Sequence, residues 1–366
     1  QDFKIKLGKI KVEKPLLIEA DGSRRNVFPM EARLRKLTYS APINLSVSTY
    51  VDGVERESFT VPIGKIPVML KSKYCHLQGL SKESLVQAYE DSNDPGGYFI
   101  LNGNERVLII VEDLASNKLF IDKAKTWPSK YTARLYSERG SYRIPHLIEQ
   151  MKDGVINFSF TRVKRIPVVA IIKALGLVKD QEISNAISKD KSYDDIFINL
   201  YECIDLKTQE DALEFIAKKI GITQSREEKI ERATEMVDKY LYHHLGIKQE
   251  DRIRKAYTLC KYIKRFLIVS KGNLQLSDKD HYMDKRLKLS GDLLADLFRV
   301  NLRTLIQDML YNFQRLVKRG KFQSVKIIIR DQLLTSRIKS AMATGVWVGG
   351  RKGISQNIDR TNFTAT

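Results

Sequence analysis

Residues 94–107 have the sequence DPGGYFILNGNERV, in which turn-forming and strand-forming segments alternate. Asp94-Pro95-Gly96-Gly97 predicts a tight turn, because proline restricts φ and glycine accepts positive φ. Tyr98–Leu101 is then a strand, Asn102-Gly103 is a hairpin turn, and the apolar run Val107–Val111 is the returning strand. A fully apolar strand is expected to be buried on both faces. This stretch therefore predicts a β-hairpin packed inside a core.

Two further signals place this hairpin in a mixed unit. Asp52-Gly53 separates the alternating runs Leu45–Val51 and Val54–Val61, which is a strong hairpin signal. Ser81 can cap a short helix that ends in polar residues near position 91. The first third of the chain is therefore predicted to be a mixed α/β or α+β unit.

The middle of the chain changes to helical periodicity. Val168–Gly176 follows a proline and ends in glycine, and Thr208 begins a second helix. Ser225 and Glu228 have the spacing of a capping box, and residues 251–270 predict an amphipathic helix with a basic outer face. We expect a separate, mostly helical domain between boundaries near 140 and 290.

A long helix and a glycine-rich loop follow this domain. Residues 292–319 keep a helical pattern of apolar positions up to Gly320, and a helix of that length spans roughly 40 Å. Such an element suits a link between domains or a support for them. Residues 345–353, GVWVGGRKG, are rich in glycine. The expected fold class is an α+β multidomain protein.

The charge balance suggests a class of partner. The 366 residues include 63 Lys+Arg and 44 Asp+Glu, which gives a formal net charge of +19. This surplus favours a polyanion, since each neutralised phosphate releases counterions, whereas a solvated basic surface is the alternative. No run of about eighteen apolar residues and no signal peptide are present, and three cysteines form neither a disulfide framework nor a zinc ribbon. We expect a soluble, intracellular protein without a membrane partner.

The polar clusters do not assemble an active site. His243-His244 ends a predicted helix, and adjacent histidines point to different faces, so a structural or surface role is expected. Asp278, Asp280 and His281 could in principle bind a divalent cation, but the interleaved Lys279 would compete for the carboxylates. Buried ion pairing at a domain junction is the expected use of this segment.

Two more segments have the composition of a functional site. Cys75 and His76 resemble a nucleophile and its base, but neighbours in a strand face opposite sides and no orienting carboxylate is near. The loop Gly349–Gly353 carries Arg351 and Lys352 but lacks the spacing of a phosphate-binding P-loop. Taken alone it is either a basic loop suited to phosphates or an ordinary surface loop. We expect no catalytic residue, metal site or cofactor in this chain.

Four segments resemble motifs of a known family, the second-largest subunit of multisubunit DNA-directed RNA polymerases. Residues 94–107 are similar to its DPGGYFI-NG-E-(K/R)-V signature, and residues 278–287, DKDHYMDKRL, to its D-x-D-H/S-x-x-N-K-R-L segment. Residues 353–362, GISQNIDRTN, resemble its G-x-S-Q-x-x-(D/N)-R stretch, and residues 33–40 add a weaker match. The segments occur in the family's order, and the archaeal form of this subunit resembles the chain most.

The resemblance implies a domain plan. Residues 1–138 are expected to be the first part of the protrusion, residues 139–293 an inserted lobe, residues 294–340 the return of the protrusion, and residues 341–366 the start of the fork. The chain would then be an N-terminal portion, either a natural split subunit or a truncated one. The hybrid-binding domain, the catalytic-barrel half and the zinc clamp of the family are expected beyond Thr366.

The resemblance also implies roles for single residues. Gln356 would lie against the nascent RNA, and Asp359 and Arg360 match neighbouring positions, Arg360 being expected to pair locally or to meet a phosphate. Arg351 and Lys352 fall in fork loop 1 and would contact phosphates near the RNA–DNA hybrid.

Other motif residues are expected to be structural. At position 284 the family usually has asparagine, and Asp284 can accept a hydrogen bond but cannot donate one. The expected structural residues are Asp94, Pro95, Gly96, Gly97, Asn102, Gly103, Asp280, His281, Lys285 and Arg286.

The function implied is that of one wall of the DNA cleft, contacting template and RNA–DNA hybrid during transcription. The implied partners are DNA, RNA, the largest subunit, other polymerase subunits and transcription factors. The catalytic Mg²⁺ ions would be held by the largest subunit, so this chain alone is expected to be inactive. The expected location is the archaeal cytoplasm, or the nucleus for a eukaryotic source. The alternative is a stand-alone module that binds nucleic acid or docks transcription factors without a polymerase role.

Overall fold

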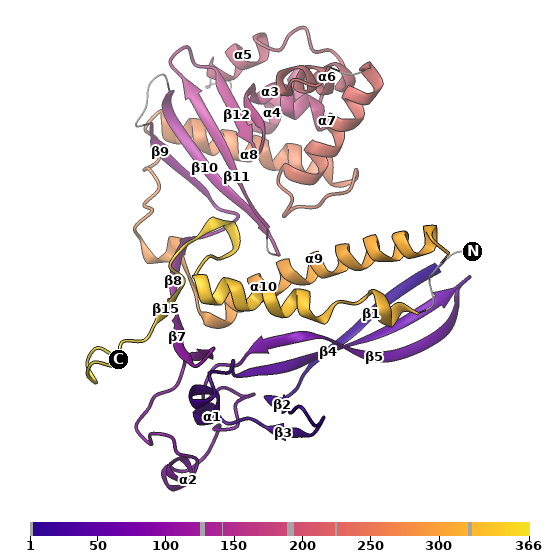
Figure 1. Ribbon diagram of the computed structural model, residues 1–366. Coiled ribbons are helices and arrows are strands. Elements are labelled where there is room, and N and C mark those ends of the chain that lie inside the picture. The colour runs from indigo at the N-terminus through magenta and orange to yellow at the C-terminus, as the bar shows by residue number, and fades with distance from the viewer. Residues whose placement is uncertain (1–2, 125–128, 141, 189–193, 224, 321–323) are drawn as a thin grey trace. The chain divides into compact units, whose positions relative to one another are not determined.

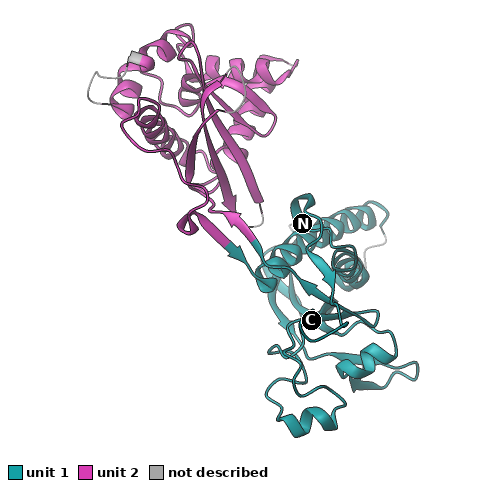
Figure 2. Cartoon of the chain, turned by 90° about the vertical axis from the view of Figure 1, so that its left-hand side faces the viewer, with its two compact units in different colours: residues 1–111, 287–366 teal, residues 112–286 magenta. Residues whose placement is uncertain are grey.

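The computed structural model describes residues 3–124, 129–140, 142–188, 194–223, 225–320 and 324–366. The chain divides into two compact units (Figure 2). Unit 1 comprises residues 1–111 and 287–366, and unit 2 comprises residues 112–286. Helices and sheets occur in both units, which confirms the expected α+β class. Within the described residues, no helix is both long enough and apolar enough to cross a membrane.

A three-stranded antiparallel sheet forms the base of unit 1. Its order is β1-β4-β5, with β1 at Phe3–Val12, β4 at Ser40–Val51 and β5 at Val54–Pro67. The predicted Asp52-Gly53 turn connects β4 to β5, and both of its residues have positive φ, 50° and 83°. Along β4 alternate residues are buried, as expected for a sheet with one covered face.

Two helices cover this sheet, α9 at Ser290–Lys318 and α10 at Asp331–Thr344 (Figure 1). The helix predicted over residues 292–319 is confirmed by α9, which ends just before Gly320. A 3₁₀ turn at Val325–Ile328 precedes α10. The core between sheet and helices includes Ile43, Leu45, Val47, Ile63, Leu297, Leu305, Met309, Leu334 and Ile338.

The hairpin of residues 98–108 belongs to a second small sheet of unit 1. Its order is β15-β7-β6, with β6 at Phe99–Leu101, β7 at Asn104–Leu108 and β15 at Ser355–Asn357. The shorter elements nearby are β2 at Leu16–Ile18, β3 at Arg24–Asn26, α1 at Pro29–Leu34, α2 at Lys82–Gln87 and a 3₁₀ turn at Val348–Gly350.

The prediction of a fully buried strand at Val107–Val111 is wrong. Strand β7 ends at Leu108, and the side chains of Ile109 and Ile110 are 39% and 58% exposed. The physical reason is that β7 already pairs with β6 and β15, after which the chain leaves unit 1. The apolar run therefore spans the exit from a sheet instead of its interior.

Unit 2 combines a sheet with a set of helices. The five-stranded antiparallel sheet has the order β13-β12-β11-β10-β9. Its strands are β9 at Leu119–Lys123, β10 at Ser129–Arg139, β11 at Tyr142–Met151, β12 at Ile156–Phe160 and β13 at Val163–Pro167. The helices are α3 at Val168–Ala174, α4 at Asp180–Ile187, α5 at Asp194–Tyr201, α6 at Gln209–Ile220, α7 at Arg226–Tyr240 and α8 at Asp251–Ser270. The predicted helices are present, but the sequence pattern did not predict the sheet.

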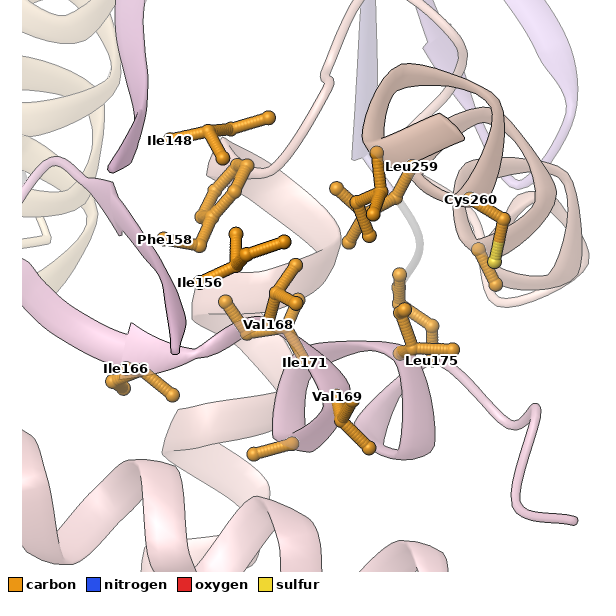
Figure 3. Close-up of a cluster of buried hydrophobic side chains, with 14 of the residues drawn as sticks. Ile148, Ile156, Phe158, Ile166, Val168, Val169, Ile171, Leu175, Leu259 and Cys260 are labelled. Carbon is orange, nitrogen blue, oxygen red and sulfur yellow. The ribbon is translucent and has the colours of Figure 1, made fainter. Parts of the chain in front are cut away.

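The core of unit 2 lies where the sheet meets α3 and α8. Figure 3 shows Phe158 and Ile156 of β12 beside Val168 and Ile171 of α3. Every residue of α3 is buried, including Lys173, whose ammonium group donates to the carbonyl oxygens of Cys203 and Leu206. The cysteines Cys75, Cys203 and Cys260 are buried free thiols.

Three histidines pack inside unit 2. His146 is stacked on Tyr242, and burial lowers the pKa of His146 to about 3. The Nδ1 atoms of His243 and His244 lie 2.8 and 2.7 Å from Oγ of Ser137. Burial also lowers the pKa of His243, and that of His244 to about 4. The histidine pair thus attaches the end of α7 to β10, which is the structural role that the sequence predicted.

The compact units divide the chain at other residues than the expected 138 and 293. Strand β10 spans residue 138, and β9 and β10 pair with the sheet of unit 2. The chain passes between the units through β8 at Val111–Leu114 and β14 at Lys285–Lys288, which pair with each other. The assignment of protrusion, lobe and fork to particular residues stays a prediction.

Candidate nucleic-acid interface

The carboxyl-terminal residues of unit 1 are built into the hairpin. Gln356 of β15 is opposite Val107 of β7, and the N–H of Ile109 donates to the carbonyl oxygen of Ile354 at 2.8 Å. The N–H of Ile358 donates to the carbonyl oxygen of Glu105 at 3.1 Å. Two motifs that lie some 250 residues apart in sequence, at 94–107 and 353–362, are therefore neighbours in one sheet.

Arg33, which belongs to the weaker match at residues 33–40, also contacts this hairpin. Its Nη1 donates to both carboxylate oxygens of Glu90, at 2.8 and 2.9 Å, and its Nε donates to Glu105 at 2.8 Å. Its Nη2 donates to the hydroxyl oxygen of Tyr98 at 2.7 Å. The hydroxyl of Tyr98 in turn donates to Oδ2 of Asp94 at 2.5 Å.

Arg360 completes the same network from the carboxyl-terminal side. Its Nε donates to Glu105 at 2.6 Å and its Nη2 to Asp94 at 3.3 Å. Its guanidinium carbon lies 5.0 Å from the centre of the Tyr98 ring, and that of Arg33 lies 6.0 Å from it. We call Arg33, Glu90, Asp94, Tyr98, Glu105 and Arg360 the motif network, since five of the six belong to segments that resemble the family.

The motif network favours the ionised form of Asp94 and Glu105. Burial alone would raise the pKa of Asp94, but hydrogen bonds from Tyr98, Gly96 and Arg360 outweigh it and lower that pKa. For Glu105, burial is likewise outweighed by hydrogen bonds from Arg360 and Arg33, so its pKa is lowered. Arg360 therefore pairs locally, which is one of its two expected roles, and a phosphate would have to compete with two carboxylates for it.

The turn residues of the hairpin allow close backbone contacts. Oδ1 of Asp94 accepts the N–H of Gly96 at 2.8 Å, next to the exposed Pro95. Gly96 has φ +73°, and a Cβ there would lie 3.0 Å from the carbonyl oxygen of Leu70. Gly97 donates to that oxygen at 3.1 Å. Glycine is thus required at this turn by both conformation and space.

The second turn of the hairpin packs on the loop after α1. Gly103 has φ +81°, and a Cβ there would lie 3.0 Å from the carbonyl oxygen of Arg33. The N–H of Gly103 donates to the carbonyl oxygen of Leu37 at 3.0 Å, and that of Asn102 to Oγ1 of Thr38 at 3.2 Å. Both turns therefore make close backbone contacts, and the architectural role expected of them stays a prediction.

The glycine-rich loop before β15 has a fixed base and an open end. Trp347 is buried, its Nε1 donates to the carbonyl oxygen of Leu293 at 2.9 Å, and its N–H donates to that of Arg351 at 2.7 Å. Gly345 has φ +72°, and a Cβ there would lie 2.9 Å from the carbonyl oxygen of Ser355. At Gly349, in contrast, a Cβ would meet nothing within 4 Å.

The expected nucleic-acid contacts lie on or beside this loop. Lys352 and Gln356 are exposed, and Arg351 is half-buried. Nε2 of Gln356 donates to the carbonyl oxygen of Gly353 at 3.2 Å, and the side chain of Gln356 is exposed. Asp359 is exposed and accepts hydrogen bonds from Thr361, which lower its pKa. The negative charge of Asp359 disfavours a phosphate beside it.

The motif at residues 278–287 lies in unit 2, except for its last residue, and forms a different kind of site. Ion pairs join Lys279 to Asp122, Lys118 to Asp284, and Lys285 to Glu112. Asp284 is buried and acts as an acceptor, in keeping with its chemistry.

The remaining residues of this motif are on the surface. Asp278 and Asp280 are exposed, so the prediction that they form buried ion pairs is wrong. His281 is also exposed and its Nδ1 accepts the N–H of Met283, while Nη1 of Arg286 donates to backbone carbonyl oxygens. In the described parts of the chain, no group of three or more His, Cys, Asp or Glu residues could hold a metal ion. Lys279 and Lys285 pair with carboxylates outside the motif, Asp122 of β9 and Glu112 of β8.

Sequence reasoning missed part of the motif network. Arg33, Tyr98 and Glu105 belong to the family-like motifs, but the sequence alone gave them no role, and it did not single out Glu90. The available signal was a set of charged and aromatic residues inside otherwise apolar or turn-forming segments. Only the fold shows that these residues meet.

Comparison with known proteins shows the family to which the chain belongs. The family model described as "RNA polymerase beta subunit" matches residues 1–336. Subunit Rpo2 of the DNA-directed RNA polymerase of Saccharolobus solfataricus is 42% identical over 364 residues, which is 99% of this chain and 32% of that protein. Subunit Rpo2N of Methanocaldococcus jannaschii is 42% identical over 373 residues, covering the whole chain and 75% of that protein. Subunit Rpo2N of Halobacterium salinarum is 39% identical, covering 98% of the chain and 71% of that protein.

The coverage differs between the two kinds of relative. The chain spans about a third of the length of the Rpo2 relatives and about three quarters of Rpo2N of M. jannaschii. Sequence identity of about 40% extends over both compact units. The chain therefore belongs to the RNA polymerase β-subunit family and corresponds to the N-terminal portion of its second-largest archaeal subunit.

Proposed function

We propose that the chain forms one wall of the DNA cleft of a DNA-directed RNA polymerase and contacts the template and the RNA–DNA hybrid during transcription. Its partners are then DNA, RNA, the largest subunit, other polymerase subunits and transcription factors. The polymerisation reaction is a two-metal phosphoryl transfer, and we assign its Mg²⁺ ions to the largest subunit. On this proposal the chain binds no cofactor, makes no RNA by itself and works in the cytoplasm of an archaeon.

The observation that supports this proposal is the anchored basic loop of residues 345–353. Its base is held by Trp347 and β15, while Arg351 and Lys352 lie on the part next to Gly349 and Gly350. Among the described residues, no heavy atom other than those of the glycine and its adjacent residues lies within 4 Å of either Cβ position. A polyanion backbone can thus approach closely, and cationic side chains on a fixed loop contact phosphates without reading the base sequence.

Gln356 adds a polar contact of another kind. Its side chain is exposed on β15, one residue after the buried Ser355. An amide can donate to and accept from a ribose or base edge, so it suits a nucleic acid chain that moves past it. The motif network holds β15 against β7 and thereby fixes where this amide lies.

The test is the double substitution Arg351→Ala and Lys352→Ala in the assembled polymerase. We expect elongation complexes to dissociate faster, because two phosphate contacts are lost. The slope of log affinity against log salt should fall by about one unit per lost contact. The measurement is the lifetime and the equilibrium binding of elongation complexes over a series of salt concentrations.

The matched control is Lys207→Ala with Lys248→Ala, which removes the same charge from exposed positions of unit 2. The control should leave the slope unchanged. If both double variants change the slope equally, only the total charge matters and the proposed contacts are refuted. Affinity capture with the tagged chain should also recover the largest subunit, whereas a stand-alone nucleic-acid-binding module would recover none.

A further inference from the structure

Unit 1 contains a small pocket whose lining includes no residue of the motif network or of the basic loop. It lies between α10, the ends of β4 and β5, and the loop after α1, and its volume is about 250 Å³. All of its lining residues belong to unit 1. They are Leu16, Leu17, Val27, Lys36, Leu37, Thr38, Ser40, Lys65, Pro67, Asn102, Thr335 and Lys339.

All charged residues that line this pocket are basic. Lys36, Lys65 and Lys339 contribute three ammonium groups, and the lining includes no Asp or Glu. Among the described residues, none of these three lysines forms an ion pair with a carboxylate. Elsewhere in unit 1 several exposed cations are paired, for example Arg25 with Glu19 and Glu31. Three unpaired cations around one small pocket favour an anionic ligand.

The lysines are held by separate elements. The backbone N–H of Lys65 donates to Oγ1 of Thr335 at 2.9 Å, which joins β5 to α10 beside the pocket. Lys36 follows α1, where its N–H donates to the carbonyl oxygen of Arg33 at 3.3 Å. Lys339 lies one helical turn after Thr335 on the same helix. The fold therefore sets the backbone positions of the three lysines around the pocket.

The floor of the pocket is aliphatic. Leu16, Leu17, Leu37, Val27 and Pro67 line it, and no aromatic or arginine side chain does. Proteins that bind single-stranded nucleic acid usually stack bases on aromatic rings or arginine planes, which this pocket does not offer. The volume is also below the roughly 300–1,000 Å³ of pockets that enclose a drug-sized ligand. It suits a single apolar side chain.

We propose that this pocket binds an acidic protein segment. One apolar side chain of the segment rests on the aliphatic floor, and carboxylates on either side of it pair with Lys36, Lys65 and Lys339. Charge complementarity of this kind sets partner choice and association rate more than total affinity. The proposal concerns a protein partner and is independent of the contacts that we assign to the basic loop.

The test uses a fluorescent decapeptide, DEDELFEDED, as the probe and the full chain as the receptor. Saturable binding is expected, measured by fluorescence anisotropy. Binding should be lost when every acidic residue of the probe is replaced by its amide, and should weaken severalfold when its Leu-Phe pair is replaced by Ser-Ser. A labelled deoxythymidine decamer shows whether the pocket takes nucleic acid instead.

The variant that isolates the pocket is Lys36→Ala with Lys339→Ala. It should raise the dissociation constant of the peptide about tenfold, since two charge pairs are removed. The control Lys4→Ala with Lys6→Ala removes the same charge from exposed positions of β1 and should change the constant less than twofold. Circular dichroism checks that the variants fold, which is expected because the substituted side chains are on the surface or at the pocket rim.

Three results would overturn the proposal. The first is no saturable peptide binding at millimolar concentration, and the second is an equal effect of the pocket and control variants. The third is binding of the decamer as tight as that of the peptide and equally sensitive to the pocket variant, which would make the pocket a nucleic-acid site.

Discussion

At the scale of single residues, Tyr98 lies between the two arginines of the motif network. It is 3% exposed, accepts from Arg33 and donates to Asp94, and both guanidinium groups approach its ring. Its recurrence in a family motif could be recognised in the sequence, but its partners could not. Arg33 and Arg360 are far from it along the chain, so no local pattern connects them.

We predict that Tyr98→Phe destabilises unit 1. The substitution keeps the ring but leaves Arg33 and Asp94 each without one partly buried hydrogen bond, which costs about 1–3 kcal/mol. The measurement is urea unfolding followed by circular dichroism. Tyr89→Phe is the matched control, because Tyr89 is 82% exposed and should tolerate the loss of its hydroxyl. Equal stability of the two variants would contradict the role given to Tyr98.

A second prediction at this scale concerns pH. Burial lowers the pKa of His146 from 6.5 to about 3, so the folded state binds its proton less readily than the unfolded state does. Its contribution to stability is therefore complete above pH 6.5 and is lost as pH falls below that value. His243 and His244 act in the same direction, since their pKa values are also lowered.

The measurement is the free energy of unfolding between pH 7 and pH 5. His146→Phe removes one of the titrating groups, and the loss of stability over this range should be smaller by about 2 kcal/mol. His281→Gln, at an exposed position, is the control and should leave the pH dependence as it is. A pH dependence that stays unchanged in His146→Phe would show that this ring is not the group responsible.

At the scale of elements, turns and helix ends were the most predictable features. The Asp52-Gly53 turn, the cap at Ser81 and the start of α7 after Ser225 lie where the residue types place them. These features depend on a few adjacent residues, and tertiary contacts alter them little.

The sheet of unit 2 was not predicted because its inward positions include polar residues. Ser137, His146 and Gln150 are buried on strands β10 and β11, which interrupts the alternation of apolar and polar residues. The hydrogen bonds that satisfy Ser137 and His146 come from the helix end near Tyr242, far away in sequence. The alternation of apolar and polar residues is therefore weak in these two strands, because their buried polar side chains contact the helix end.

We predict that Gly345→Ala detaches β15. Its added Cβ would lie 2.9 Å from the carbonyl oxygen of Ser355, at a φ of +72°. Gly349→Ala is the matched control, since its φ is +80° but its Cβ would meet nothing within 4 Å. Both variants carry about 1–2 kcal/mol of backbone strain, and only Gly345→Ala adds the clash. Amide hydrogen exchange at Ile354 and Ile358 should accelerate in Gly345→Ala alone; equal exchange in both variants would argue that the clash is relieved elsewhere.

At the scale of the whole molecule, the chain makes one unit from its two ends and the other from its middle. The sequence predicted an inserted unit, but no local pattern showed that β9 and β10 belong to the sheet of the middle unit. The three apolar core clusters each belong to a single unit. The units are therefore expected to be stabilised separately.

We predict that unit 1 folds without unit 2. Joining Val111 to Leu287 through a short glycine-serine loop is feasible because β8 and β14, which contain these residues, pair with each other. The shortened protein should unfold cooperatively and keep slow amide exchange in β4, β5 and α9. Collapse to a state without a cooperative transition would show that unit 1 needs the inserted residues.

The discontinuity of unit 1 also has a consequence for biosynthesis. Strands β1, β4 and β5 leave the ribosome early, but α9, α10 and β15, which cover and extend the sheets of this unit, are made only after all of unit 2. At a synthesis rate of about 5–20 residues per second, the nascent sheet waits on the order of 10 s with its apolar face open. The inserted unit can reach its native state first. Residues 1–111 of unit 1 are therefore the part of the nascent chain that ribosome-associated chaperones are expected to bind.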